Sequence, residues 1–539
     1  MIKMHCTPSK AFFRPGEPIR LELAFETPAR GTVEATIYRL ADATAIWTDQ
    51  ADGRSCVLEG ALPAEAPCGY GVRARLLDGD GRVAATASAA FDVLEHWTQA
   101  PRYGFLSEYG PGRNDVQATM DWVVRYHLNG LQYYDWQYRH ERLLPPSETY
   151  TDLLGRSLSL DTIKRLVAAG HERGIAAMPY TAIYGASDAF YREHPRLALT
   201  DRLGTPFRLG ESFLVIMNPD SPWAEHLLGE FATVLDSIAF DGIHIDQYGA
   251  PFVGQDASGT RIDLGEVFPA FIDKAAALVE QRRGGSGSVI FNAVGNWPVD
   301  RVACSAEAAV YIEVWPPYRE FLDLYRIVVN AQQAGAGKPV IVAAYIDPAH
   351  VANWRLADAV IFASGAYRLE LGEPGAMLAD PYFPRFGQLD RPAQDILKRY
   401  YDFQVRYEEV LSLGTQDGGE RRYSLACPQK ESSTHKPDIL TVVRRGDQFE
   451  TFNLINFTGL PHQMWDTPLA SDPTPCGPLN VEIVIDRPVR RIWRASPDGE
   501  DLSAHDLAFR QNLDRGVHNA HFEIPRLAYW DMIVVEYAP

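Results

Sequence analysis

The chain has 539 residues, of which 46% are hydrophobic and 22% charged, and its formal net charge is −19 at pH 7. This composition is ordinary for a soluble globular protein, and the length allows about two to four domains. The negative charge argues against a nucleic acid or an anionic membrane surface as partner, because both attract clustered Lys and Arg.

The first segment, "MIKMHCTPSKAFFRPGE", lacks the continuous apolar run of a signal peptide. No stretch approaches the roughly 18 apolar residues of a membrane span. The sequence as given therefore predicts a cytoplasmic protein, or a secreted one if an export signal has been trimmed. The six cysteines are scattered, without a C-x-x-C pair or zinc-like spacing. We therefore expect a reduced compartment, no metal site and no cofactor.

Residues 1–97 alternate apolar and polar side chains in short bursts such as "PIRLELAFE", with turn signals such as "LDGDGR" between them. This pattern predicts an N-terminal Ig-like β-sandwich. Residues 418–539 return to strand-like runs, among them "ILTVVRR" and "YWDMIVVEY", and predict a second antiparallel β-sandwich. Between the two lies a region of different character, residues 98–413.

In this central region, apolar strand-like runs alternate with segments of helical period. The runs are 102–109, 130–136, 175–181, 240–246, 289–294, 309–315, 339–345 and 359–365. One helix is expected to begin after the cap Ser159 and to stop at Gly174, and another runs through 266–283 with Pro269 in its first turn. Eight strands with intervening helices predict a (β/α)8 TIM barrel. A doubly wound open sheet is the alternative, but no glycine-rich phosphate loop supports it.

Polar residues stand where several of these runs end, and the chemistry of a TIM barrel sits at that end of the strands. In the fourth run, every second residue from Phe240 to Asp246 points to one side of the strand, which should be the barrel interior. Ile243 and Ile245 point to the other side and should face the helices. In the sixth run, Glu313 shares the inward phase with Tyr311. We therefore expect Asp246 and Glu313 to converge on one barrel mouth.

Two such carboxylates allow structural and functional interpretations. They form an ion pair with an arginine or bind a metal, or they flank a glycosidic bond as nucleophile and general acid. Aromatic rings that stack on sugars and polar groups that bind hydroxyls favour the second. The candidates near strand ends are Tyr134, Asp135, Trp136, Gln137, Tyr184, His244, Tyr248, Asn292, Trp297 and Trp315. Each aromatic residue alone fits packing equally well, and His244 alone is as readily a core histidine.

The segment "HLNGLQYYDWQYRHERLLPP" (127–146) resembles the strand-two signature of glycoside hydrolase family 66. That family holds the endo-dextranases and the cycloisomaltooligosaccharide glucanotransferases. Four further segments resemble the family in its order: "MPYTAIYGA" (178–186), "FDGIHIDQYG" (240–249), "YIEVWPPY" (311–318) and "IFASGAYRLELGEPGAMLADPYFP" (361–384). The last adds Glu370 to the candidate substrate-binding residues. The sandwich–barrel–sandwich layout agrees with the family.

The resemblance implies retaining hydrolysis of α-1,6-linked glucans, with Asp246 as nucleophile, Glu313 as acid/base and Asp135 against the sugar just before the cleavage point. The glucanotransferases carry a carbohydrate-binding module between strands seven and eight. Here only "IDPAHVANWRLADA" separates Tyr345 from Ala359. This favours an endo-dextranase acting on dextran or isomaltooligosaccharides. The alternatives are a transglycosylase, an exo-acting α-glucosidase or a non-catalytic glycan-binding protein, and the presence of both carboxylates counts against the last.

These roles carry geometric and electrostatic expectations. The carboxyl groups of Asp246 and Glu313 should lie about 5–5.5 Å apart, the retaining geometry. Asp246 should be ionised, its pKa held low by donors such as His244 or Asn292. The pKa of Glu313 should be raised by the charge of Asp246 and by apolar neighbours such as Trp315.

Overall fold

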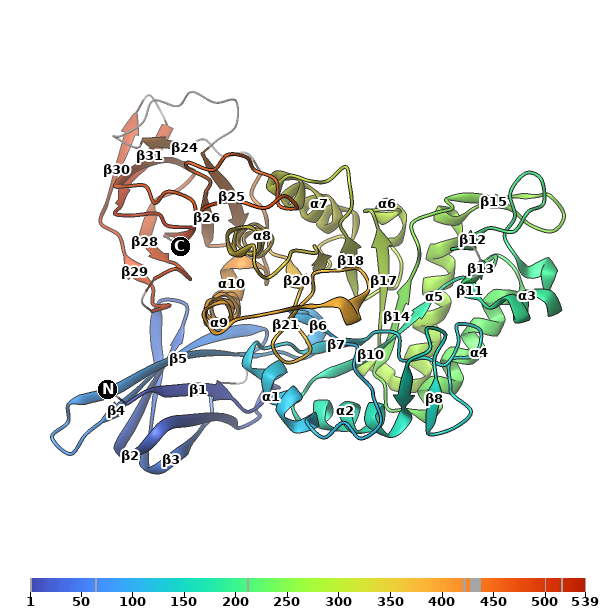
Figure 1. Ribbon diagram of the computed structural model, residues 1–539. Coiled ribbons are helices and arrows are strands. Elements are labelled where there is room, and N and C mark those ends of the chain that lie inside the picture. Colours follow the sequence, from blue (N-terminus) through green and yellow to red (C-terminus); the bar gives the residue numbers. More distant parts are fainter. Residues whose placement is uncertain are drawn as a thin grey trace.

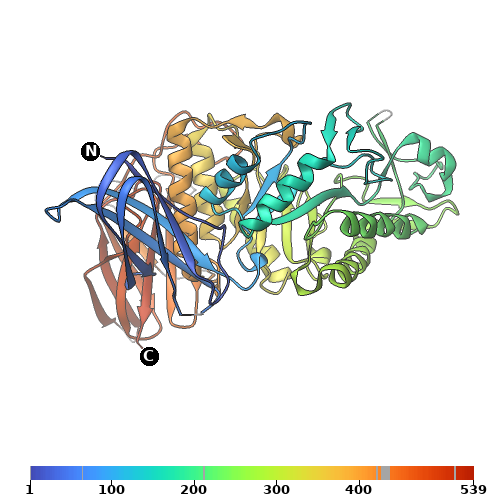
Figure 2. The same cartoon turned by 90° about the horizontal axis from the view of Figure 1, so that it is seen from below.

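The computed structural model describes residues 2–63, 65–210, 213–419, 423–426, 438–499, 501–514 and 517–538. A central barrel carries two β-rich units, which lie side by side at one end of the molecule (Figure 1). The second view shows the same elongated arrangement, with both chain termini at that end (Figure 2). The opposite end is formed by the loops and helices after the third and fourth barrel strands.

Eight parallel strands form the barrel sheet in chain order. They are β6 (Tyr103–Leu106), β7 (Gly130–Tyr133), β10 (Ala176–Ala182), β14 (Gly242–Asp246), β17 (Ser288–Val294), β18 (Ala309–Glu313), β19 (Val340–Ala343) and β20 (Tyr367–Leu369). At least one helix follows each strand: α1 (Val116–Arg125), α2 (Leu160–Glu172), α3 (Asp188–Glu193) and α4 (Pro222–Ser237), α5 (Leu264–Arg283), α6 (Val299–Val302), α7 (Phe321–Ala334), α8 (Val351–Ala363) and α9 (Arg391–Arg406). This arrangement fits a TIM barrel, as the strand count predicted.

The two helix boundaries expected from sequence differ in outcome. Ser159 caps α2 as predicted, because its side chain accepts the amide of Thr162. Helix α5 begins at Leu264 rather than 266, so Pro269 lies beyond the first turn. The cap is Asp263, whose carboxylate accepts the amide of Gly265.

The prediction of the eighth strand is wrong. The run 359–365 overlaps the end of α8, and the strand β20 follows it. Eleven of the 13 residues of α8 are buried, because it packs between the barrel and the C-terminal unit. Such a helix lacks the polar face that marks a surface helix, so its apolar run looks like a buried strand.

Short β-hairpins and small sheets follow the carboxyl ends of the barrel strands and surround the barrel mouth. They are the hairpin β8 (Thr149–Thr151) and β9 (Ser157–Ser159), the sheet of β11 (Gly185–Ala186), β12 (Arg208–Leu209) and β13 (Leu214–Ile216), the hairpin β15 (Val253–Gln255) and β16 (Arg261–Asp263), and the pair β21 (Ala376–Met377) and β22 (Gly387–Gln388). This is the face at which barrel enzymes place their active sites.

The first and eighth strands meet at a tight seam. The amide of Phe105 donates to the carbonyl oxygen of Leu371 at 3.1 Å. A Cβ added at the next residue, Gly372, would lie 1.7 Å from the carbonyl oxygen of Phe105. Glycine is therefore required for the two backbones to approach each other here.

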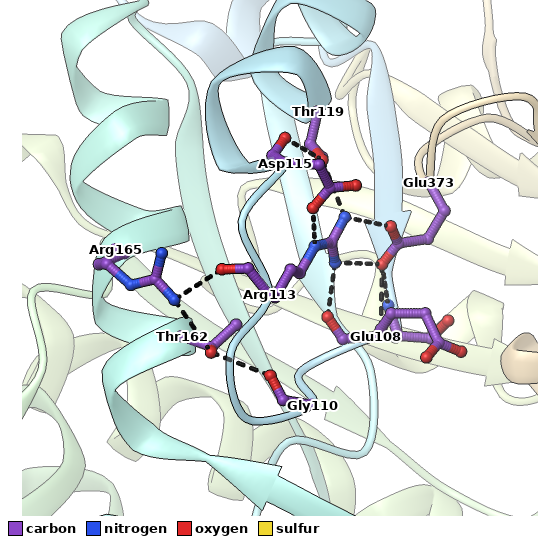
Figure 3. Close-up of polar contacts among 9 residues, drawn as sticks. Glu108, Gly110, Arg113, Asp115, Thr119, Thr162, Arg165 and Glu373 are labelled. Carbon is purple, nitrogen blue, oxygen red and sulfur yellow. Dashed lines mark hydrogen bonds and ion pairs between the residues drawn. The ribbon is translucent and has the colours of Figure 1, made fainter.

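Glu373 extends the seam with its side chain (Figure 3). Its carboxylate accepts the amides of Ser107 and Glu108, each at 3.0 Å. The guanidinium of Arg113 binds both carboxylate oxygens, at 3.1 and 2.7 Å. The charge of Glu373 is buried, but each of these groups partners it. The loop after β20 is thereby fixed to the loop after β6.

Replacing Glu373 with Ala should lower the free energy of unfolding by about 3 kcal/mol, because Arg113 and two amides would lose their buried partner. Chemical denaturation monitored by tryptophan fluorescence measures this difference. Disruption of the exposed pair Arg30–Asp52 serves as control and should change stability little. A Glu373 variant as stable as the wild type would contradict the proposed role in the seam.

The N-terminal unit has five antiparallel strands: β1 (Met4–Pro8), β2 (Ile19–Arg39), β3 (Asp42–Gly60), β4 (Cys68–Leu77) and β5 (Val83–Val93). The expected Ig-like sandwich implies two sheets, but hydrogen bonds join these strands into one. The long strand β2 continues through a register shift between Ala24 and Ala29. Residues on both sides of the shift contribute to one core, so the sheet folds over on itself.

The C-terminal unit has two antiparallel sheets, the layout expected of a β-sandwich. One contains β23 (Gln416–Asp417), β25 (Ile439–Arg445), β26 (Phe449–Asn456), β32 (Trp530–Tyr537), β28 (Val489–Ala495) and β29 (His505–Asp506). The other contains β24 (Tyr423–Ala426), β27 (Leu479–Ile485), β31 (Val517–Ile524) and β30 (Phe509–Asp514). Side chains from both sheets, such as Phe452 and Phe522, share one core.

Buried contacts tie both β units to the barrel. Arg102, just before β6, pairs with Asp92 of β5 at 2.6 Å and with Glu408 of α10 (Glu408–Leu411) at 3.2 Å. On the C-terminal side, Trp530 packs edge-to-face on Phe403 of α9, with ring centroids 4.9 Å apart. The three units therefore form one packed body rather than separate modules.

Candidate active site

The predicted alternation holds within the fourth and sixth strands. His244 lies inside the barrel, where its ring stacks on Tyr103 and meets Tyr311 edge-on, with centroids 5.8 and 5.0 Å away. Ile243 belongs to the outer core that packs against the helices. Phe240 departs from the prediction and lies in this outer core, because β14 begins only at Gly242.

A single amide brings the two carboxyl groups together. The side-chain nitrogen of Asn292, on β17, donates to Asp246 Oδ1 at 2.7 Å and to Glu313 Oε2 at 2.9 Å. The sum of these two distances, 5.6 Å, is therefore the largest separation that these oxygens can have. This bound accommodates the separation of about 5–5.5 Å that retaining glycosidases use.

Two tyrosines complete the hydrogen bonding of the carboxyl pair. Tyr180 donates to Asp246 Oδ2, and Tyr345 donates to Glu313 Oε1, each at 2.7 Å. Sequence reasoning did not select either residue. Both continue the inward phase of their strands, after Met178 in β10 and after Ala343 in β19. The parity argument used for strands four and six would have found them.

The electrostatics of the pair differ from the expectation. Burial, and next the neighbouring Glu313 carboxyl, raises the pKa of Asp246 to about 7, although Tyr180 and Asn292 act in the opposite direction. Burial also raises the pKa of Glu313. The predicted low pKa of Asp246 is therefore wrong, because two donors do not offset desolvation and a second carboxyl. Near neutral pH such a pair shares one proton, which is the state that a nucleophile and a general acid need together.

His244 does not act as the expected donor to Asp246. Its Nδ1 lies 3.2 Å from the hydroxyl of Tyr103, deeper in the barrel. Burial lowers the pKa of His244 to about 3, so its imidazole is neutral. His244 is thus part of the packed barrel floor beneath the carboxyl pair.

The carboxyl pair lies in a cavity of about 680 Å³. Eight predicted residues line it: Tyr134, Asp135, Gln137, Asp246, Tyr248, Asn292, Glu313 and Trp315. Residues that the sequence analysis did not select also line it, among them Gln132, His140, Tyr180, Tyr311, Tyr345, Tyr382, Phe383 and Arg385. The volume falls in the usual range of small-molecule sites. The tyrosine-rich wall offers both ring faces and hydroxyls to a polyhydroxylated ligand.

Three predicted aromatic residues do not line this cavity, which corrects their assignment as sugar contacts. Trp136 is fully buried on the outer side, where its indole donates to the carbonyl of Tyr180 at 3.1 Å. Tyr184 is also fully buried, and its hydroxyl accepts the amide of Tyr248 at 2.6 Å. Trp297 packs edge-to-face on Phe268 of α5. All three lie beyond the last residue of their strands, where side chains no longer follow the alternation of the strand.

Glu370 is a second correction, since it does not line the cavity either. It is fully buried and pairs with Arg368 at 2.9 Å, which also binds Asp358 of α8 at 2.7 Å. The hydroxyl of Tyr401 donates to Glu370 at 3.1 Å. This group lies between β20 and helices α8 and α9, so Glu370 stabilises the barrel wall.

Asp135 has the properties of a ligand-binding carboxylate. It adopts a positive φ of 48°, which is uncommon for a residue other than glycine and frequent at functional sites. Arg156, from the β8–β9 hairpin, donates to its carbonyl oxygen at 2.7 Å and lies 3.8 Å from its carboxylate. Burial raises the pKa of Asp135 to about 7.

Two further findings bear on the chemistry and the setting of the site. Among the described residues, no group of three or more His, Cys, Asp and Glu side chains is placed to hold a metal ion. None of the helices in the described ranges is long and apolar enough to cross a membrane.

A (β/α)8 barrel with two adjacent carboxyl groups in a tyrosine-lined cavity at its C-terminal face has the architecture of a glycosidase. The family comparison agrees. Residues 8–534 match the model of glycosyl hydrolase family 66, and the chain belongs to that family.

Curated relatives and a solved structure carry two activities in their names. A cycloisomaltooligosaccharide glucanotransferase of Niallia circulans is 22% identical over 85% of this chain, which spans 63% of that enzyme's length. A dextranase of Streptococcus salivarius is 21% identical over 87% of this chain and 67% of its own. The crystal structure of a Paenibacillus sp. cycloisomaltooligosaccharide glucanotransferase with cycloisomaltoheptaose superposes with a TM-score of 0.91, at 19% identity, over 99% of this chain and 100% of that one.

Proposed function

We propose that this protein is an endo-acting glycoside hydrolase that cleaves α-1,6-glucosidic linkages in dextran or isomaltooligosaccharides with retention of configuration. The observation that carries the proposal is the Asn292 amide, which holds one oxygen of Asp246 and one of Glu313 within 5.6 Å of each other, the sum of 2.7 and 2.9 Å. A separation of this size leaves room for a sugar carbon but not for the water of an inverting enzyme.

The residues divide the reaction as follows. A carboxylate oxygen of Asp246 attacks the anomeric carbon, and Glu313 gives its proton to the departing glycosidic oxygen. The product is a glucosyl ester on Asp246 with inverted configuration. Glu313, now ionised, removes a proton from water, which attacks the anomeric carbon and releases the sugar with its original configuration. Asn292 supports both carboxyl groups throughout, and Tyr180 and Tyr345 each support one.

The extent of the cavity supports endo action. It continues from the carboxyl pair past Asp135 to Leu154 of the β8–β9 hairpin, and on the other side reaches the 37%-exposed indole of Trp315. An exo-acting enzyme closes the cavity behind the terminal sugar, whereas lining residues beyond Asp135 are expected where the site takes more than one glucosyl unit on that side.

A digest of dextran tests the proposal directly. Endo-hydrolysis should give reducing isomaltooligosaccharides of mixed length, and proton NMR should show the α-anomer first. Glucose as the initial product would indicate exo action. The absence of any product from dextran and from isomaltooligosaccharides would overturn the proposal.

A cyclising or linear transglycosylase is the second candidate, favoured by the superposition on a glucanotransferase. Between β19 and β20 this chain has only a short loop and helix α8 within residues 344–366. No additional domain is therefore inserted at that place, and we propose hydrolysis as the main outcome. Cyclic isomaltooligosaccharides in the dextran digest would reverse this order.

Activity should be insensitive to chelation, because the proposed reaction uses two carboxyl groups and no Lewis acid. Initial rates of dextran hydrolysis before and after dialysis against EDTA measure this. A loss of activity that one divalent ion restores would contradict the prediction. A thermal unfolding scan of the dialysed protein would separate a catalytic ion from a stabilising one.

A further inference from the structure

A second group of polar side chains lines the active cavity without a role in the mechanism above. Gln137, His140 and Tyr248 all line it. Gln137 Oε1, His140 Nδ1 and the Tyr248 hydroxyl are buried and have no hydrogen-bond partner among the described residues. The side chains of Gln137 and His140 are only 5% and 6% exposed. Buried polar groups are nearly always paired, so these three atoms point to a partner that binds in the cavity.

The three side chains follow two barrel strands, β7 and β14, which are separated in the sheet by β10. Gln137 and His140 lie in the loop after β7, and Tyr248 lies two residues beyond Asp246 at the end of β14. Gly185, after the intervening strand β10, leaves room for them. A Cβ there would lie 2.9 Å from the Tyr248 hydroxyl and 3.1 Å from His140 Cδ2. These two side chains therefore meet around the same position.

The chemistry of the group fits an uncharged hydroxylated ligand. Burial lowers the pKa of His140 to about 4, so its imidazole is neutral and offers one donor and one acceptor. The hydroxyl of Tyr248 can donate and accept, and the free oxygen of Gln137 accepts. The Gln137 amide also hydrogen-bonds to the Asp135 side chain. An anion would meet the carboxyl groups of Asp135 and Asp246, which line the same cavity.

The position of the group decides which sugar it meets. Tyr248 lies further along the chain than Asp246, toward the barrel mouth, and His140 lies further along than Asp135. In the sheet, β10 and β7 follow β14, the strand of Asp246, on the side away from β17 and β18, and β18 carries Glu313. The group therefore lies beyond the first sugar, opposite the departing one.

We infer that Gln137, His140 and Tyr248 form a hydroxyl-binding subsite for the second glucosyl unit of the glycon, next to the unit held by Asp246 and Asp135. This inference rests on the proposed function. It assigns to these residues the recognition of chain length rather than the cleavage step. Filling the subsite adds binding energy for a substrate with two α-1,6-linked units over one with a single unit.

The experiment measures kcat/KM for 4-nitrophenyl α-glycosides that carry one, two and three α-1,6-linked glucosyl units. For the wild type, kcat/KM should rise strongly when the second unit is added, and this rise is the gain compared below. Tyr248→Phe and His140→Phe, which keep a ring but remove the polar atoms, should each reduce that gain about 10-fold, the effect of one lost hydrogen bond. The further gain from a third unit should match that of the wild type.

Two more variants separate recognition from packing. Gly185→Ala adds a methyl group between Tyr248 and His140, so it should also reduce the gain from the second unit. Tyr150→Phe is the matched control, because that hydroxyl donates to the carbonyl of Trp136 and Tyr150 does not line the cavity. It should leave the gain as in the wild type.

Each outcome bears on a different claim. Folded Tyr248 and His140 variants with the wild-type gain would overturn the subsite while leaving the proposed function intact. An equal loss on all three substrates would also overturn it, because the residues would then serve the first sugar or the fold. If the wild type cleaves neither these glycosides nor dextran, the proposed function fails and the subsite with it.

Discussion

Replacing Asp246 with Asn should lower kcat on every α-1,6-glucan by on the order of 10⁴-fold or more, because no covalent glucosyl–enzyme can form without the carboxylate. Asn keeps the shape of the site. In the wild type, Asn292 and Tyr180 each donate a hydrogen bond of 2.7 Å to Asp246. The side-chain oxygen of the new Asn can still accept from Asn292, and its amide can donate to the hydroxyl oxygen of Tyr180. Release of reducing sugar from dextran measures the loss. An Asn variant within tenfold of the wild type would contradict the role of Asp246 as nucleophile.

The same variant should be more stable than the wild type near neutral pH. Burial raises the pKa of Asp246 from 3.8 to about 7, so the folded protein holds a proton that the unfolded chain releases. The stability contributed by this group therefore falls as pH rises from about 4 to 7 and then stays low. Asn carries no charge and escapes this penalty. The free energy of unfolding of the variant minus that of the wild type should therefore be roughly 2–4 kcal/mol larger at pH 8 than at pH 4. Thermal unfolding at both pH values separates a lost nucleophile from a misfolded protein.

The alternation of side chains along strands predicted the centre of the site well. Asp246 and Glu313 converge because a strand of period two leaves no choice once its isoleucines face the helices. The same rule, not applied to strands three and seven, would have given Tyr180 and Tyr345. The rule fails for Trp136 and Tyr184, because both lie after the last residue of their strands or at the edge of a loop, where no fixed period applies.

The remaining errors have a common cause in long-range packing. Helix α8 is buried on nearly all sides by the barrel and the C-terminal unit, which no local pattern reveals. Glu370 follows Arg368 on the outward phase of β20, and only the position of Asp358 on that helix shows that all three form a buried ion group. The pKa of Asp246 likewise depends on how deeply the barrel mouth is desolvated, so a list of neighbouring donors could not predict it.

Replacing Glu313 with Gln should affect substrates according to their leaving group. Gln can keep the contacts with Asn292 and Tyr345, at 2.9 and 2.7 Å in the wild type, but it has no proton to give. A sugar hydroxyl is a poor leaving group, so cleavage of isomaltooligosaccharides should fall by about 10²–10⁴-fold. A 2,4-dinitrophenyl glycoside leaves without a proton, so the formation of its glucosyl–enzyme should be largely spared. Burst kinetics with that substrate measures the difference, and an equal loss on both substrates would contradict the role of general acid.

Azide should then separate the two carboxyl groups by the configuration of the product. In the Glu313→Gln variant, azide needs no general base and attacks the glucosyl–Asp246 ester, and two inversions give the α-glucosyl azide. In an Asp246→Gly variant, azide occupies the space left by the carboxylate and displaces the leaving group directly, and one inversion gives the β-glucosyl azide. Proton NMR of the products distinguishes the two anomers by the coupling constant between the anomeric proton and the proton on C2. The opposite pairing of variant and anomer would exchange the roles of Asp246 and Glu313, while their shared contact with Asn292 would keep the retaining geometry in place.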